Sequence, residues 1–126
     1  MSKKRIFKTK TFNKIFNKLG LSDQDLIKAA KEIEAGLYEA NLGGNLFKKR
    51  VAIGNRGKSQ GLRTILATKI SKHIFFIFVF SKSDKSNIDN NELLYLLKIS
   101  EFLFHLSNEQ LFSLMSQKYL FEVKYD

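Results

Sequence analysis

Several residue types that build special sites are missing from this chain of 126 residues. It has no cysteine, which excludes a disulfide framework, a thiolate nucleophile and any zinc site that uses cysteine, and which suits a reducing cytoplasm. It has no proline either, so none of its strands is restricted to a sheet edge on that ground. Its two histidines, His73 and His105, lie outside any cluster of metal-ligating residues. We therefore expect neither a metal ion nor a cofactor.

Three kinds of signal are absent as well. Residues 2–18 contain no uninterrupted apolar core of the kind that a signal peptide needs, and the longest apolar run is far too short to cross a bilayer. Gly57, Lys58 and Ser59 resemble the end of a phosphate-binding loop but lack the upstream glycine of that motif. No internal repeat or linker divides the chain. We expect one cytoplasmic domain over residues 1–126, without a membrane span or a small-molecule ligand.

The net charge of +10 is unevenly distributed. Residues 1–83 contain 18 Lys and Arg against 5 Asp and Glu, whereas residues 84–126 contain 4 against 7. Such asymmetry favours a polyanionic partner for the first two-thirds of the chain, because phosphate contacts supply most sequence-independent affinity for nucleic acid. The alternative is that the lysines reflect a compositional bias and form only a solvated surface.

Residues 45–82 combine cations, a glycine-punctuated loop and apolar strands. We predict strands over residues 45–50, 62–68 and 74–80, the last of which is apolar throughout, as in a strand covered on both faces. If these strands pair antiparallel, the loop of residues 54–61, the start of the second strand and the end of the third meet at one edge of the sheet. That edge would form a concave cationic site. Its candidate side chains are Lys48, Lys49, Arg50, Arg56, Lys58, Arg63 and Lys82.

Two amphipathic helices are predicted before this stretch. The first covers residues 11–19, is capped by Thr11, ends at Gly20 and has one apolar stripe. The second opens with a capping box of Ser22 and Asp25 and has an apolar face that runs to Leu37. This helical hairpin is expected to cover one face of the sheet.

The C-terminal part supplies further helices. Residues 91–105 form a predicted helix that is apolar almost all round, which is more than one sheet face can bury. A capping box of Ser107 and Gln110 opens a last helix, and residues 119–125 alternate as an edge strand does. Either this tail or a partner is expected to cover the apolar helix. The predicted class is α+β, a small antiparallel sheet packed by the N-terminal helical hairpin and C-terminal helices, with residues 107–126 as a helix–strand extension.

A cluster of lysines and arginines suits cleavage of RNA. RNA supplies its own nucleophile in the 2′-hydroxyl, so an enzyme needs only to position it, move its proton, stabilise the charge at phosphorus and protonate the leaving oxygen. Lysine and arginine can share these tasks where crowding among cations lowers the pKa of a lysine.

Three spaced motifs in the same stretch resemble those of a known family. They read KKRVA over residues 48–52, GNRGKSQGLRT over residues 54–64 and FFIFVFSKSDKSNI over residues 75–88. Together they resemble the RelE/HigB-like toxins of type II toxin–antitoxin systems, in the RelE/ParE superfamily. The resemblance implies a RelE-like fold, an endonuclease that cleaves messenger RNA in the decoding site of the ribosome, and a cognate antitoxin that silences it.

The resemblance also implies roles for individual cations. Arg63 looks like the strand arginine that steadies the scissile phosphate, and Lys58 looks like the loop lysine that acts as base. Lys82 stands where the family places a cation after the last long strand, a candidate general acid. The residues implied in RNA-backbone contacts are Lys48, Lys49, Arg50 and Arg56. Many members carry an aromatic residue or a histidine near the end of the domain that stacks on a base, whereas here Ser83 and Asp84 follow Lys82.

Other functions fit the same residues. Each cation could hold a phosphate without taking part in chemistry, as in a plain RNA-binding module. A ParE-like toxin that inhibits DNA gyrase and cleaves nothing shares the fold, and a fold does not determine function. The combination of Lys58, Arg63 and Lys82 favours the endonuclease, because an inhibitor that only binds protein has no need for it.

Overall fold

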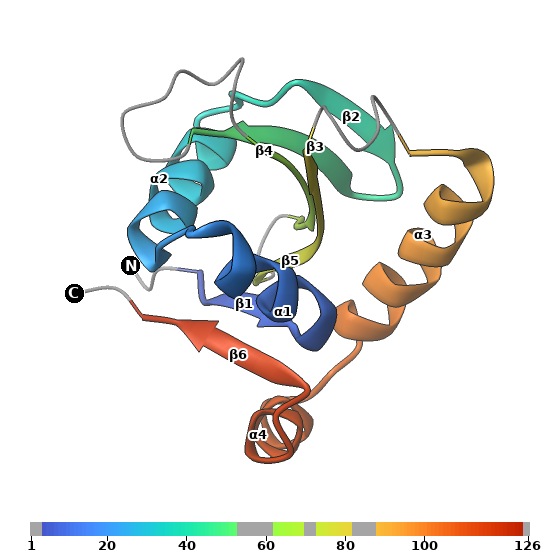
Figure 1. Cartoon of the computed structure of the whole chain (residues 1–126). Helices are drawn as coiled ribbons and strands as arrows, with labels where there is room; N and C mark the ends of the chain where they lie inside the picture. Colours follow the sequence, from blue (N-terminus) through green and yellow to red (C-terminus); the bar gives the residue numbers. More distant parts are fainter. Residues whose placement is uncertain (1–3, 53–61, 70–72, 82–87, 125–126) are drawn as a thin grey trace.

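The computed structural model describes residues 4–52, 62–69, 73–81 and 88–124. In chain order the elements are β1 (Ile6–Thr9), α1 (Lys10–Leu19), α2 (Asp23–Glu34), β2 (Ala40–Gly43), β3 (Leu46–Val51), β4 (Leu62–Ala67), β5 (Ile74–Ser81), α3 (Asn90–Phe104), α4 (Asn108–Ser116) and β6 (Leu120–Val123). The strands form one curved sheet with helices packed around it (Figure 1). The predicted α+β class is confirmed. Among the helices described, none has the length and apolar character that a bilayer span requires.

The strand order in the sheet is β2-β3-β4-β5-β1-β6. The three strands predicted within residues 45–82 are β3, β4 and β5, and they pair antiparallel, as predicted. One pair differs: β1 lies between β5 and β6 and runs parallel to β5. The sheet is therefore mixed rather than wholly antiparallel, because the first strand of the chain pairs with a strand far along the sequence.

Strand β2 forms a hairpin with β3 and was not predicted from the sequence. Gly43 pairs with Leu46, so the turn consists of Gly44 and Asn45, whose φ angles are +57° and +66°. Positive φ at both central residues is what a type I′ turn requires. This turn therefore joins two neighbouring strands of the sheet.

Helices α1 and α2 cover one face of the sheet, as predicted. Their apolar sides join a cluster with alternate strand residues, which includes Phe12, Phe16, Leu26, Ile33, Leu66, Phe76 and Val79. The capping box of Ser22 and Asp25 is present. Two predicted boundaries are wrong. Thr9 rather than Thr11 caps α1, since its hydroxyl accepts from the Phe12 amide at 3.3 Å, and α2 ends at Glu34, which leaves Leu37 beyond the helix and exposed.

Strand β5 is covered on both faces, as its apolar run predicted. Ile74, Phe76 and Val79 belong to the cluster under α1 and α2, whereas Phe75, Ile77 and Phe80 belong to the opposite cluster. The pairing with β4 skips Ile77, since Ile65 pairs with Phe78 and Leu66 with Phe76. This bulge leaves Ile77 and Phe78 on the same side of the sheet, towards α3.

Helices α3 and α4 lie on that opposite side. The C-terminal half of α3 buries Leu103 and Phe104 in a cluster that also contains Leu111 of α4 and Leu120 of β6. The capping box of Ser107 and Gln110 is present. The tail therefore covers the end of α3. One side of α3 stays open, with Leu94 58%, Tyr95 65% and Phe102 59% exposed.

Strand β6 is the edge strand that the alternation predicted, and it pairs with β1. The guanidinium of Arg5 donates to both carboxylate oxygens of Glu122 at 2.9 Å. The hydrogen bonds from Arg5 are the main reason that the pKa of Glu122 falls to about 2. This ion pair fastens the last strand to the start of the chain.

Candidate nucleic-acid interface

The register of the sheet brings two arginines side by side. Arg50 of β3 and Phe80 of β5 are the partners of Arg63 in β4, one on each side. Directly paired residues project from the same face of a sheet, and Phe80 belongs to the cluster on the α3 side. Arg50, Arg63 and Phe80 thus form a row across three strands on that face, which we call the arginine row. Lys48 lies in the next row, opposite Ile65 and so on the same face.

Arg63 is the unusual member of the arginine row. Its side chain is buried, with only 6% of the residue exposed, and its Nη1 atom has no hydrogen-bond partner in the part of the chain that the structure describes. A guanidinium stays charged in proteins, and a buried donor without a partner costs about 1–3 kcal/mol. Such a group is suited to receive a phosphate oxygen, which would satisfy the donor and the charge together.

Arg50, the strand partner of Arg63, also favours an anion at the arginine row. Its side chain is exposed, while its backbone amide donates to the carboxylate of Glu39 at 2.6 Å. Like charges directly opposite each other on one sheet face are destabilising. Two arginines in paired positions therefore favour an anion that contacts both.

Lys49 lies on the other face of β3, because successive side chains of a strand alternate. Only 1% of the residue is exposed, and its Nζ lies 2.7 Å from Oε1 of Glu32 in α2. The hydroxyl of Thr64 donates to the Lys49 carbonyl at 2.9 Å. The predicted backbone-binding residue is thus tied to α2 and separated from Arg50 by the sheet itself.

Three predicted site residues, Arg56, Lys58 and Lys82, lie outside the described residues. The strand ends that flank them are described: Leu62 pairs with Val51 on one side and with Ser81 on the other. The end of β3, the start of β4 and the end of β5 therefore meet at one end of the sheet, as predicted. The arginine row lies one residue further in, since Arg63 follows Leu62.

An apolar groove continues from the arginine row. The rings of Phe80 and Phe78 contact each other, with centroids 5.8 Å apart, and Phe78 lines a groove of about 520 Å³ between β5, α3 and the start of α1. The groove was not predicted from the sequence. The feature of the sequence that could have indicated the groove is the spacing of Tyr95, Ile99 and Phe102, which places these three side chains on one stripe of α3.

No group of three or more His, Asp and Glu side chains in the described parts of the chain is placed to hold a metal ion. The groups that the described part of the interface offers to a ligand are cations and aromatic rings.

The comparisons with known proteins agree with the motifs. The model of one protein family, described as the RelE toxin of the RelE/RelB toxin–antitoxin system, matches residues 4–123. The match includes every strand and helix described above. No curated protein sequence matches the chain.

Proposed function

This chain belongs to the RelE toxin family, and from that premise we propose that it is an endonuclease that cleaves messenger RNA on the ribosome. As a toxin of a toxin–antitoxin system it has a cognate antitoxin as partner. Its site of action would be the cytoplasm, where translating ribosomes are found. The single observation that carries the proposal is Arg63, a buried arginine of the arginine row whose Nη1 donor has no partner among the residues that the structure describes.

In this proposal the arginine row binds the scissile phosphate. The 2′-oxygen attacks phosphorus, the bond to the 5′-oxygen breaks, and the products carry a 2′,3′-cyclic phosphate and a 5′-hydroxyl. Arg63 donates to the non-bridging oxygens, on which negative charge increases in the transition state. Arg50, Lys48 and Arg56 hold neighbouring phosphates and keep the backbone in line.

We assign the two proton transfers to Lys58 and Lys82. Lys58, in the connection between β3 and β4, would take the proton of the 2′-hydroxyl as a neutral amine. Lys82, directly after Ser81 at the end of β5, would give a proton to the leaving 5′-oxygen as an ammonium ion. Several cations within one site favour a neutral lysine, because like charges lower the pKa of an amine.

We assign a different role to Lys49. Its ion pair with Glu32 at 2.7 Å fixes β3 against α2, and β3 carries Arg50. Lys49 therefore acts as a positioning residue that holds the arginine row in place, not as a contact to RNA.

In this proposal the ribosome orders the RNA strand for in-line attack. The described site has cations and a pair of phenylalanine rings, which hold a backbone but do not order a flexible single strand for in-line attack. Purified protein should be incubated with one messenger RNA, either naked or on translating ribosomes, and the ends mapped. We expect the protein to cleave only the RNA on translating ribosomes and to leave 5′-hydroxyl ends.

Other outcomes identify other functions. Equal cleavage of naked and ribosome-bound RNA would show a free-standing ribonuclease. Cleavage of neither, with inhibition of supercoiling by DNA gyrase, would show a ParE-like toxin. Binding of RNA without cleavage or growth arrest would show a binding module.

A further inference from the structure

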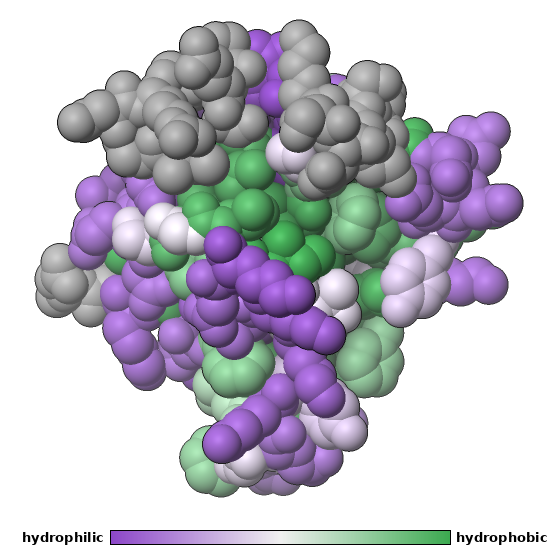
Figure 2. Space-filling view, viewed as in Figure 1, coloured by the Kyte–Doolittle hydropathy of each residue, from purple (hydrophilic) through white to green (hydrophobic). Residues whose placement is uncertain are grey.

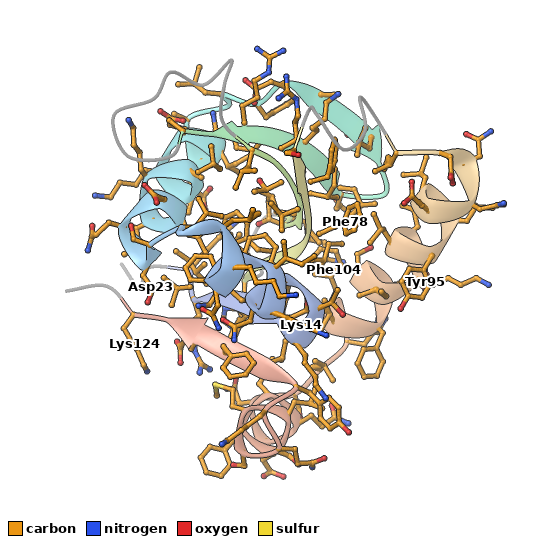
Figure 3. The ribbon with its side chains drawn as sticks, in the orientation of Figure 1. Lys14, Asp23, Phe78, Tyr95, Phe104 and Lys124 are labelled. Atoms are coloured by element: carbon orange, nitrogen blue, oxygen red, sulfur yellow. The ribbon has the colours of Figure 1, made fainter. Side chains whose placement is uncertain are left out.

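The two ends of the arginine row are held in different ways. At one end, Phe80 is buried and its ring contacts the ring of Phe78. Figure 2 shows apolar side chains gathered in the middle of this side of the molecule, and Figure 3 shows Phe78 between the sheet and α3 in the same view. Packing therefore fixes the Phe80 end of the row. At the other end, the side chain of Arg50 is exposed.

The backbone groups of Arg50 point away from β4. In an antiparallel strand, the backbone groups of successive residues face its two neighbours alternately. The Asn45 carbonyl, just before β3, accepts from the Thr68 amide at 3.1 Å, so the odd-numbered residues of β3 face β4 and Arg50 faces the other side. Arg50 and Arg63 are thus a non-hydrogen-bonded pair, in which the Cα atoms are about 4.5 Å apart and the side chains lie close together.

On that other side, β2 is too short to reach the Arg50 amide. Ala40, the first residue of β2, pairs with Lys48, two positions before Arg50. The amide of Glu39 donates to the Lys48 carbonyl at 2.9 Å, and the carboxylate of Glu39 accepts from the Arg50 amide at 2.6 Å. A hydrogen bond to a carboxylate is about twice as strong as one between neutral groups. The Glu39 side chain therefore takes the place of the missing strand.

The residue before Glu39 holds the same strand through its ring. Tyr38 contacts the ring of Phe47 in β3, with centroids 4.8 Å apart. Phe47 in turn packs against the apolar cluster under α1 and α2. Tyr38 and Glu39 together fasten β3 at Phe47, Lys48 and Arg50, and we call these two residues the edge clamp.

We propose that Glu39 is a positioning residue, whose carboxylate holds the end of β3 so that Arg50 stays beside Arg63 when RNA binds. This inference rests on the proposed function. Like charges directly opposite each other on a sheet face repel, and the carboxylate opposes their separation because it bonds the Arg50 amide and adds a negative charge nearby. Backbone hydrogen bonds of a sheet run from strand to strand, so the carboxylate lies at the sheet edge and leaves the face of the arginine row open to phosphate.

The expected effect on RNA binding is the opposite of a simple charge effect. Removing a carboxylate beside a cationic site should by charge alone strengthen the binding of a polyanion. We expect Glu39→Ala instead to weaken the affinity for a short single-stranded RNA about tenfold, and Glu39→Gln to stay within about threefold, because its amide oxygen still accepts from the Arg50 amide. The control is Glu109→Ala, which removes the same charge from the exposed surface of α4, far from β3 (Figure 1).

A double-variant cycle measures whether Glu39 acts through Arg50. In the Arg50→Met background, Glu39→Ala should change the RNA affinity by less than about twofold. On translating ribosomes, Glu39→Ala should raise the protein concentration for half-maximal cleavage about tenfold and lower the rate at saturation less than about threefold. Circular dichroism would verify that each variant is folded.

Nuclear magnetic resonance tests the hydrogen bond without RNA. The amide proton of Arg50 should resonate at low field and should shift when acid protonates the Glu39 carboxylate. Glu39→Ala should abolish this dependence on pH, whereas Glu109→Ala should preserve it. Inorganic phosphate should shift the signals of Arg50 and Arg63 in the unsubstituted protein, and mainly that of Arg63 in Glu39→Ala.

The outcomes separate this role from the others. Tighter RNA binding by Glu39→Ala, or an equal loss in Glu39→Gln, would overturn the proposal, because charge rather than the hydrogen bond would then set the affinity. A tenfold loss that persists in the Arg50→Met background would overturn it as well. If the unsubstituted protein neither bound nor cleaved RNA, the proposed function would fail, whereas the resonance of the Arg50 amide and its response to phosphate would still decide whether Glu39 positions Arg50.

Discussion

Replacing Arg63 by methionine should abolish catalysis without weakening the fold. Methionine keeps an unbranched side chain in the arginine row but removes the charge and the donors. In the free protein, Arg63 is buried, has a donor without a partner among the described residues, and lies opposite Arg50. Removing an unsatisfied buried donor recovers about 1–3 kcal/mol. The free energy of unfolding of Arg63→Met should therefore equal or exceed that of the unsubstituted protein by up to about 3 kcal/mol.

Although Arg63→Met should not lower the stability, it should strongly lower the rate of cleavage. Loss of one preorganised donor to a transition-state oxygen typically costs about 3 kcal/mol, or a hundredfold or more in rate. Arg63→Lys should recover little, because an ammonium cannot reproduce the two-pronged geometry of a guanidinium. Arg50→Met should weaken binding of ribosome-bound RNA in a salt-dependent manner and affect the cleavage step less. Lys31→Met, which removes the same charge from the surface of α2, is the control.

The assay combines two measurements on the same preparations. Single-turnover cleavage on programmed ribosomes gives the rate, and urea unfolding in a buffer without phosphate gives the stability. Added inorganic phosphate should stabilise the unsubstituted protein and leave Arg63→Met unaffected, because a ligand of the native state stabilises it in proportion to its binding. Cleavage by Arg63→Met at the normal rate would refute the assignment. A loss of more than about 2 kcal/mol of stability would show that Arg63 has a structural role instead.

The other predictions concern stability. Glu122→Gln should lower the free energy of unfolding by about 1–3 kcal/mol at pH 7. Since the pKa of Glu122 is lowered to about 2 from 4.5, the ion pair stabilises the fold above pH 4.5, and the difference between the two proteins should vanish as pH falls towards 2; a constant difference would contradict this. Glu32→Gln should cost about 3 kcal/mol by leaving Lys49 buried without its anion, and the double variant with Lys49→Met should be more stable than Glu32→Gln alone. Leu111→Ala should cost about 3 kcal/mol in thermal unfolding, because Leu111 is the buried contact between the tail and the end of α3; a cost below 1 kcal/mol would show that the tail packs loosely.

Features that depend on neighbouring residues were predictable from the sequence. The two capping boxes at Ser22 and Ser107 are read from residues three apart, and both are present. The apolar run of β5 predicted burial on both faces because nothing polar interrupts it. The errors at Thr11 and Leu37 are also local, since a helix can start at either of two threonines and an apolar residue can follow its end.

For the candidate site, the sequence supplied the residue types and the structure supplied their directions. Lys48, Lys49 and Arg50 are consecutive and read as one cationic cluster. In a strand, however, neighbouring side chains point to opposite faces, so Lys49 pairs with Glu32 while Arg50 joins Arg63. The family motifs, by contrast, were readable directly, because they are spaced along a single continuous stretch.

By itself the sequence determined the class of fold, the caps and stripes of its helices, the charge asymmetry and the family. Each of these follows from residues that are close together in the chain or from composition. The tertiary structure alone decided that β1 inserts beside β5, that Arg50, Arg63 and Phe80 share one row, and that α3 leaves a groove against the sheet. These depend on which distant segments pair and in which register, and that choice is made by the packing of the whole core.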